Sequence, residues 1–163
     1  MAPHTPKTPE TPDAANLGMV RPPLVYLASI VAGLALQFFF PLRLVPPRLS
    51  LPLGAAAIVL AVVLFVTAVR SFRAAGTPVP GNQPTSAIVG TGPYRYSRNP
   101  IYLAFSLLQL GIALCVNSVW LLLTLIPAVL LMSLVVIPRE EAYLEAHFPS
   151  EFLPYKKSVR RWF

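Results

Sequence analysis

The sequence has one cysteine, Cys115, and two histidines, His4 and His147. A single thiol can form neither an internal disulfide nor a thiolate metal cluster. One of the two imidazoles lies in an amino-terminal tail, far in the sequence from the other. With this inventory we expect no zinc or haem site and no other metal site.

Charged residues are also scarce, and four long runs contain none. Only 12% of the 163 residues are charged and 55% are hydrophobic, and the mean hydropathy is +0.64, which is too apolar for an ordinary soluble domain. Each run approaches the roughly 20 apolar residues that a membrane-spanning helix needs. The sequence therefore predicts an all-α integral membrane protein with about four transmembrane helices and an interfacial carboxyl-terminal helix. The runs are Leu24–Phe40, Leu51–Val69, Pro100–Val116 and Val119–Ile137, the first having the weakest claim to a full span.

Basic residues outnumber acidic ones, with 13 Lys and Arg against 6 Asp and Glu. In a four-span chain all but two of the basic residues lie on the side that holds both termini and the second connection, and the two exceptions are Arg43 and Arg48. The positive-inside rule makes the first side cytoplasmic. The net charge of +7 then serves topology and anionic headgroups, and we expect no nucleic-acid partner. The same distribution predicts an inner or plasma membrane protein with both termini in the cytoplasm.

The chain divides into a tail and a membrane domain. Residues 1–21 include the Thr/Pro-rich stretch HTPKTPETPD, which has almost nothing to bury and is predicted to be disordered. The first apolar run follows without a convincing cleavage site, so we expect it to be a retained signal-anchor. Residues 22–163 are then a single transmembrane domain.

A long connection joins the second and third runs, from Arg70 to Asn99. Its many glycine and proline residues, beginning at Gly76, are expected to exclude regular structure. A disordered linker is one interpretation. The apolar residues Ile88 and Val89 favour another, a loop that packs on the helices and closes over a ligand.

A turn rich in Arg and Tyr lies directly before the third run. Asn is a favoured N-cap and Pro a favoured first helical residue, so Asn99 and Pro100 predict the start of the third helix. The free N–H groups at a helix start attract a carboxylate or phosphate, and Arg98 beside them can hold such an anion. The alternative is a belt of interfacial aromatics and snorkelling arginines. The residues crowded here are Tyr94, Arg95, Tyr96, Arg98 and Tyr102.

Two adjacent acids, Glu140 and Glu141, follow the fourth run. If Pro138 starts a new helix, both acids lie in its first turn, where negative charge is favourable for structural reasons alone. Helical spacing places Glu140 on the apolar stripe of that helix, Glu141 at its rim and Glu145 on the outward side. An acid on the apolar stripe needs a partner, either a ligand ammonium, sulfonium or ribose hydroxyl, or a nearby arginine such as Arg98.

The two clusters meet if the short Asn117-Ser118 segment folds the third and fourth runs into an antiparallel hairpin. Cationic, aromatic and acidic groups then share one membrane face. That combination suits a zwitterionic ligand with an aromatic ring.

The run GPYRYSRNPIYLA, a helical hairpin and then REEAYLEAHFPSEFLPYKKSVRRW resemble the membrane methyltransferases that include isoprenylcysteine carboxyl methyltransferases and phospholipid N-methyltransferases. The resemblance covers about Gly76 to Trp162. It implies an S-adenosyl-L-methionine site at the cytosolic membrane face, with Arg98, Glu140 and Glu141 in catalytic roles. Arg160 matches a basic position of the tail. The cofactor-binding residues that it implies are Tyr94, Arg95, Arg98, Asn99, Pro100, Tyr102, Glu140, Glu141 and Tyr155.

The function expected from this resemblance is methyl transfer to a lipid headgroup, or to a lipid-attached carboxylate or amine. Its partners are a lipid or lipidated substrate and the bilayer. Two alternatives stay open at this point. One is a nicotinamide-dependent membrane reductase related to sterol reductases, and the other is a non-enzymatic subunit of a small transporter. The spans contain neutral polar residues such as Gln37, Thr67 and Gln109 but no ionisable one for ion coupling.

Overall fold

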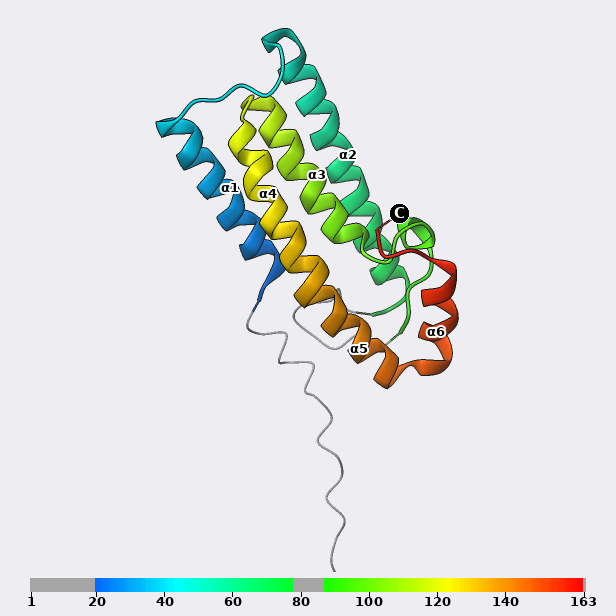
Figure 1. Ribbon diagram of the computed structural model, residues 1–163. Helices are drawn as coiled ribbons and strands as arrows, with labels where there is room; N and C mark the ends of the chain where they lie inside the picture. Colours follow the sequence, from blue (N-terminus) through cyan, green and yellow to red (C-terminus); the bar gives the residue numbers. More distant parts are fainter. Residues whose placement is uncertain (1–19, 78–86, 163) are drawn as a thin grey trace, which may run out of the picture.

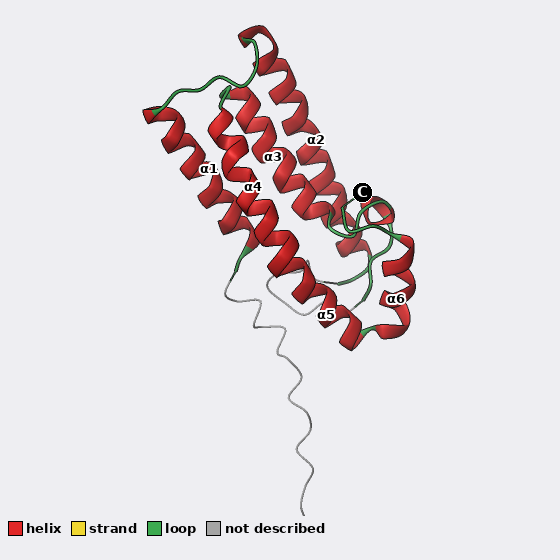
Figure 2. Cartoon of the chain, in the orientation of Figure 1, coloured by secondary structure: helices red, strands yellow, loops and turns green. Residues whose placement is uncertain are grey.

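The computed structural model describes residues 20–77 and 87–162. Helices make up most of this part of the chain, and it contains no β-strand (Figure 2). The predicted tail at residues 1–21 lies almost entirely outside the described residues, as do Pro78, Pro80, Gly81 and Pro84 of the long connection. The helices are α1 (Pro22–Phe39), α2 (Pro47–Ala74), α3 (Pro100–Cys115), α4 (Val119–Leu131), α5 (Ile137–His147) and α6 (Pro149–Ser158), with a 3₁₀ turn η2 (Gly92–Arg95) and a π-helical turn η3 (Met132–Val136).

The long helices form one bundle in which α1 packs on α4, α4 on α3, and α3 on α2 (Figure 1). Helix α4, η3 and α5 run without a break from Val119 to His147. In the described part of the chain, this 29-residue helix is one of three that are long and apolar enough to cross a membrane. The other two are α1 and α2. The prediction of an all-α integral membrane protein is confirmed.

Helix α3 has 16 residues, or about 24 Å at 1.5 Å per residue, and is shorter than α1, α2 and the continuous α4–α5 helix. The sequence pattern had pointed to the first run as the least secure span, whereas α1 has 18 residues and meets the length for a span. Helix α1 is longer than expected because it begins at Pro22. Proline is well tolerated in the first turn of a helix, so it extends α1 beyond the purely apolar run.

The turn between α3 and α4 is tight, as predicted. Asn117 adopts a positive φ of 55°, a conformation in which Asn is among the less strained residues, and the Ser118 side chain caps α4 by accepting a hydrogen bond from the Leu121 N–H. The Asn117 side chain also bonds the backbone of Leu44 and Val45, in the connection between α1 and α2. The Asn117 amide therefore ties the α3–α4 turn to the connection between α1 and α2.

Small residues allow α2 and α3 to approach closely. Gly54, Ala57 and Ala61 of α2 are buried, and Gly111 of α3 lies opposite them. A Cβ added at Gly111 would lie 2.7 Å from Cγ1 and 2.9 Å from the backbone N of Ile58. In a bilayer such close backbone contact is a main source of helix association, because lipid tails are as apolar as the side chains they replace.

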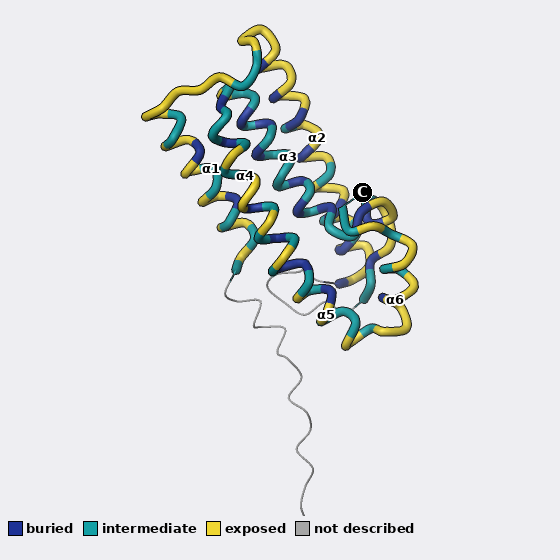
Figure 3. Tube along the Cα trace, in the orientation of Figure 1, coloured by how far each residue is buried: buried dark blue, intermediate teal, exposed yellow. Residues whose placement is uncertain are grey.

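Buried positions occur along the whole bundle (Figure 3), and two clusters of buried hydrophobic residues lie toward the end where α3 begins. One cluster joins α1, α3 and the α4–α5 helix through Tyr26, Tyr102, Ala128, Met132, Val136 and Ile137. A second cluster packs the segment before α3 on the end of α2. Its buried members are Ala68, Phe72, Val89 and Tyr94.

The prediction that the connection from Arg70 to Asn99 lacks regular structure is wrong at both ends. Helix α2 continues to Ala74, because the first helix breaker is Gly76, and η2 forms a 3₁₀ turn. The prediction that Val89 packs is consistent with its burial. Closure of this connection over a ligand stays a prediction.

A new helix starting at Pro138 was one possibility in the sequence, and α5 begins one residue earlier, at Ile137, with Glu140 in its first turn. The chain passes through Pro138 inside the α4–α5 helix after the π-helical turn η3. Proline lacks an N–H and its ring clashes with a carbonyl of the preceding turn. The wider π-turn is one way to carry a helix through such a position.

Candidate functional site

The predicted clusters meet at one end of the bundle. The start of α3 lies beside α5, and the chain after α6 returns to the same place, with the C-terminus next to the segment that precedes α3 (Figure 1). The hairpin of α3 and α4 therefore brings Arg98 close to the two acids, although more than 40 positions separate them in the sequence.

Glu141 is the centre of an ion-pair cluster. Its carboxylate lies 3.3 Å from Nη2 of Arg98 and accepts two hydrogen bonds from Arg161, at 3.1 Å from Nε and 2.8 Å from Nη2. The side chains of Arg98 and Glu141 are 11% and 10% exposed. The sequence pattern had placed Glu141 at the rim, but the structure buries it because the returning tail covers it.

Glu140 has a different partner, the phenol of Tyr102, which donates a hydrogen bond of 2.5 Å to Oε1. The backbone carbonyl of Tyr102 in turn accepts from the hydroxyl of Tyr26 on α1 at 3.3 Å. The expectation that Glu140 needs a partner is met, and within the described residues that partner is a phenol from α3 and not an arginine.

Asn99 stands at the N-cap position of α3, but its side chain makes no capping hydrogen bond. Its amide nitrogen donates instead to the backbone carbonyl of Arg161 at 3.0 Å. Pro100 is the first residue of α3 and is buried. The helix start was predicted correctly, whereas the capping role of the Asn99 side chain was not.

Two tyrosines line the site on the side of η2 and α6. The hydroxyl of Tyr155 donates to the carbonyl of Tyr94 at 2.8 Å, and the Tyr94 ring packs edge-on against Phe72, with ring centroids 5.0 Å apart. Burial raises the pKa of Tyr155 to about 12, although the charge of Arg98 lowers it in part. Burial also raises the pKa of Tyr94. Both phenols are thus neutral hydrogen-bonding groups at physiological pH.

Some of the predicted residues lie apart from the cluster. Arg95 is exposed on η2, and among the described residues its side chain has no hydrogen-bond or ion-pair partner. Arg160 reaches the cluster only through its backbone carbonyl, which accepts from the Arg98 N–H at 3.0 Å. Glu145 lies outside the cluster, as expected, but forms an ion pair with Lys156 that ties α5 to α6.

Residues 49–151 match the phospholipid methyltransferase family. The match covers well over half of the chain. The chain belongs to this family. No curated protein and no solved structure matches it. The matched range contains Arg98, Tyr102 and both acids, and it ends within α6, before Tyr155 and Arg161.

Membership makes this protein a membrane methyltransferase and implies that it acts on lipids. The family gives no support to a nicotinamide-dependent reductase or to a transporter subunit. Within the described residues no three His, Cys, Asp or Glu side chains are placed to hold a metal ion.

The ion-pair cluster around Glu141 in this methyltransferase contains hydrogen-bond donors that could bind an anionic group. Among the described residues, Nε and Nη1 of Arg98 are buried without a hydrogen-bond partner. A buried donor without an acceptor costs about 1 to 3 kcal/mol, and more when it is charged. A carboxylate of S-adenosylmethionine at this position would satisfy them, so the residues fit the cofactor that the resemblance implies.

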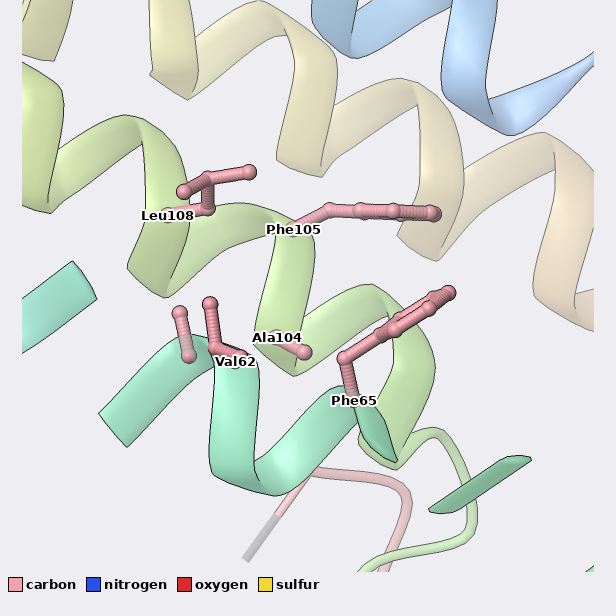
Figure 4. A pocket seen from close by; sticks show the side chains of 6 residues that line it. Val62, Phe65, Ala104, Phe105 and Leu108 are labelled. Atoms are coloured by element: carbon pink, nitrogen blue, oxygen red, sulfur yellow. The ribbon is translucent and has the colours of Figure 1, made fainter. Parts of the chain in front are cut away.

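An apolar groove lies between α2 and α3 of the methyltransferase, toward the middle of the bundle (Figure 4). It has no titratable group in its lining and can accommodate only the apolar part of a ligand. Phe65 and Phe105 form one end, with ring centroids 5.6 Å apart. The lining residues are Ala61, Val62, Phe65, Ala104, Phe105 and Leu108.

The sequence pattern missed Arg161, which donates two hydrogen bonds to Glu141. The resemblance pointed to its neighbour Arg160. The backbone is extended at Val159, and successive side chains of an extended segment point to opposite sides. Only one of two adjacent arginines can then face the acids, and the sequence alone carries no signal for which of them does.

Proposed function

We propose that the protein transfers a methyl group from S-adenosyl-L-methionine to a lipid headgroup or to a lipid-attached carboxylate or amine. The observation that carries the proposal is the buried Arg98 in a chain of the phospholipid methyltransferase family. It contacts Glu141, and two of its guanidinium nitrogens have no partner among the described residues. Few ligands combine a carboxylate with a cation and an aromatic base, and this cofactor does.

Arg98 would bind the cofactor carboxylate. The N–H groups at the start of α3 add positive potential at the same place, since the first N–H groups of a helix have no partner within the helix. Tyr94 and Tyr155 offer ring faces and one hydroxyl close by. They are suited to the adenine or ribose.

The two acids take different roles in this proposal. Glu141 already has two arginine partners, so its charge is compensated within the chain. Within the described residues, Glu140 has one hydrogen-bond partner, the Tyr102 phenol. Glu140 is therefore the acid that faces the cationic or ribose portion of the cofactor, and Glu141 is the acid that holds Arg98.

The reaction requires the protein mainly to hold the cofactor and the methyl acceptor in the correct relative orientation. When bound, the cofactor supplies an electrophilic methyl group on a sulfonium, which is open to in-line displacement without a metal. The chain contributes orientation and a site shielded from water. A carboxylate acceptor needs no base. An amine acceptor must lose a proton, and Glu140 is the base available at the site.

The lipid part of the acceptor would lie against the bundle. The groove between α2 and α3 opens on the same helix, α3, that carries the site at its start. An alkyl chain in the groove would leave its headgroup toward Tyr102. The distribution of basic residues favours the cytosolic face for this end of the bundle.

The test is a transfer assay with the purified full chain in lipid nanodiscs and cofactor labelled in the methyl group. Phosphatidylethanolamine and an isoprenylated cysteine are supplied in separate reactions. We expect label in one of the two lipids and binding of S-adenosylhomocysteine. Absence of both labelled lipid and binding would reject the proposal, and the lipid that is labelled decides between N- and O-methylation.

A further inference from the structure

The segment that follows α6 crosses the start of α3 and is fixed there by its backbone. The carbonyl of Arg160 accepts from the Arg98 N–H at 3.0 Å. The carbonyl of Arg161 accepts from the hydroxyl of Ser97 at 3.3 Å and from the amide of Asn99 at 3.0 Å. Three consecutive residues before α3 thus hold the tail in place, and the tail holds the segment that carries Arg98.

This anchoring directs the Arg161 side chain to α5. Its Nε and Nη2 donate to separate oxygens of Glu141, at 3.1 and 2.8 Å, which is the two-point geometry that makes Arg–carboxylate pairs strong. Arg98 contacts the same carboxylate through Nη2 alone. One carboxylate therefore contacts two guanidinium groups, and Arg161 forms two hydrogen bonds with it while Arg98 makes one contact.

Arg161 makes a third contact, with the backbone carbonyl of Ser133, which Pro138 cannot bond. In the π-turn the N–H of Ile137 bonds the carbonyl of Met132, five residues earlier. By the same spacing the carbonyl of Ser133 would accept from residue 138, which is a proline and has no N–H. Nη1 of Arg161 approaches this carbonyl at 3.4 Å. The helix irregularity and the tail arginine are thus complementary.

We infer that Arg161 is a positioning residue that keeps Arg98 available for the cofactor carboxylate, an inference that rests on the proposed function. With Arg161 present, Glu141 is engaged on both oxygens, and Nε and Nη1 of Arg98 stay unpaired among the described residues. The three side chains together carry one net positive charge. Without Arg161 the remaining pair is neutral, and Arg98 is free to turn both ends of its guanidinium to Glu141.

The experiment measures binding of two ligands to the full chain in detergent micelles by calorimetry. S-adenosylhomocysteine carries the carboxylate, and decarboxylated S-adenosylhomocysteine lacks only that group. The variant is Arg161→Gln, and Arg161→Lys keeps the charge but not the two-point contact. Arg160→Gln is the matched control, because it removes an adjacent exposed arginine and retains the backbone carbonyl that Arg98 uses.

We expect Arg161→Gln to bind S-adenosylhomocysteine at least about tenfold more weakly than wild type, equivalent to about 1.4 kcal/mol. Its affinity for the decarboxylated ligand should stay within about twofold of wild type. Arg161→Lys should fall between, and Arg160→Gln should match wild type for both ligands. Unchanged affinity for S-adenosylhomocysteine in Arg161→Gln, or an equal loss for both ligands, overturns the inference. A wild-type chain that binds neither ligand rejects the proposed function, and the inference with it.

Discussion

Glu140 and Glu141 are neighbours in the sequence, yet their surroundings differ, because successive residues of a helix are turned by about 100°. One acid meets a phenol of α3, and the other meets two arginines. A buried carboxylate with two cationic partners is compensated, whereas one with a single phenol as its partner gains most from a cationic or hydrogen-bonding group of a ligand. The proposed division of roles follows from this difference.

Replacement of the residues assigned to the cofactor should separate binding from folding. Arg98→Ala removes the carboxylate partner and Glu140→Gln removes the negative charge, so each should weaken cofactor binding by on the order of 2 to 5 kcal/mol. Both variants should still insert into the membrane, since neither change touches an apolar span. Titration with S-adenosylhomocysteine measures the effect. Wild-type affinity and turnover in both variants would leave these residues with structural roles alone.

Glu145→Gln is the control for that experiment. It lies one turn farther along α5 than the paired acids, and its ion pair with Lys156 has both side chains more than a third exposed. Exposed pairs contribute about 0 to 1 kcal/mol. Cofactor affinity should therefore stay within about twofold of wild type.

The tyrosine of α6 gives a pH dependence with a definite sign. Burial raises the pKa of Tyr155 from 10.0 to about 12, so its protonated form is favoured in the folded state. That contribution to stability is complete below pH 10 and is lost as pH rises from 10 to about 12. The thermal midpoint of the solubilised protein should fall over this interval. In Tyr155→Phe it should fall less, and an identical fall in both proteins contradicts the assignment.

Among the elements, the hairpin of α3 and α4 was the most predictable, because Asn117-Ser118 leaves no room for any other connection. The start of α3 followed from Asn99 and Pro100. The continuous α4–α5 helix could not be predicted. A proline usually indicates a helix boundary, and only tertiary packing decides whether a π-turn continues the helix through it. The place of Arg161 depends on that turn and on the returning tail, both of which are long-range features.

Packing of α2 on α3 depends on Gly111, since a Cβ there would lie within 3 Å of Ile58. Gly111→Val should cost about 1 to 3 kcal/mol through overpacking and lower the thermal midpoint in detergent. Ala56→Val is the matched control, because Ala56 is exposed on α2 and has room for the added methyl groups. An equal midpoint for the two variants would mean that the α2–α3 contact is not close in the folded protein.

At the scale of the whole molecule, helix length places the site at the membrane surface. The α4–α5 helix has 29 residues and is about 43 Å long, compared with about 30 Å for the hydrocarbon core of a bilayer. Glu140 lies about 32 Å along it from Val119, which is beyond the core. The charged cluster therefore needs no burial in lipid. The groove, which lies farther along α3 from its start, stays within reach of acyl chains.

The basic residues predict which membrane face carries the site. All but two of the 13 Lys and Arg lie on the side of both termini in a four-span chain, so that side should be cytoplasmic. A reporter that is active only in the cytoplasm should work when fused after Phe163. The matched fusion places the same reporter between Arg43 and Pro46, in the connection between α1 and α2, and should be inactive. The reverse pattern would put the acids and the tail on the outer face, where no cytosolic methyl donor reaches them.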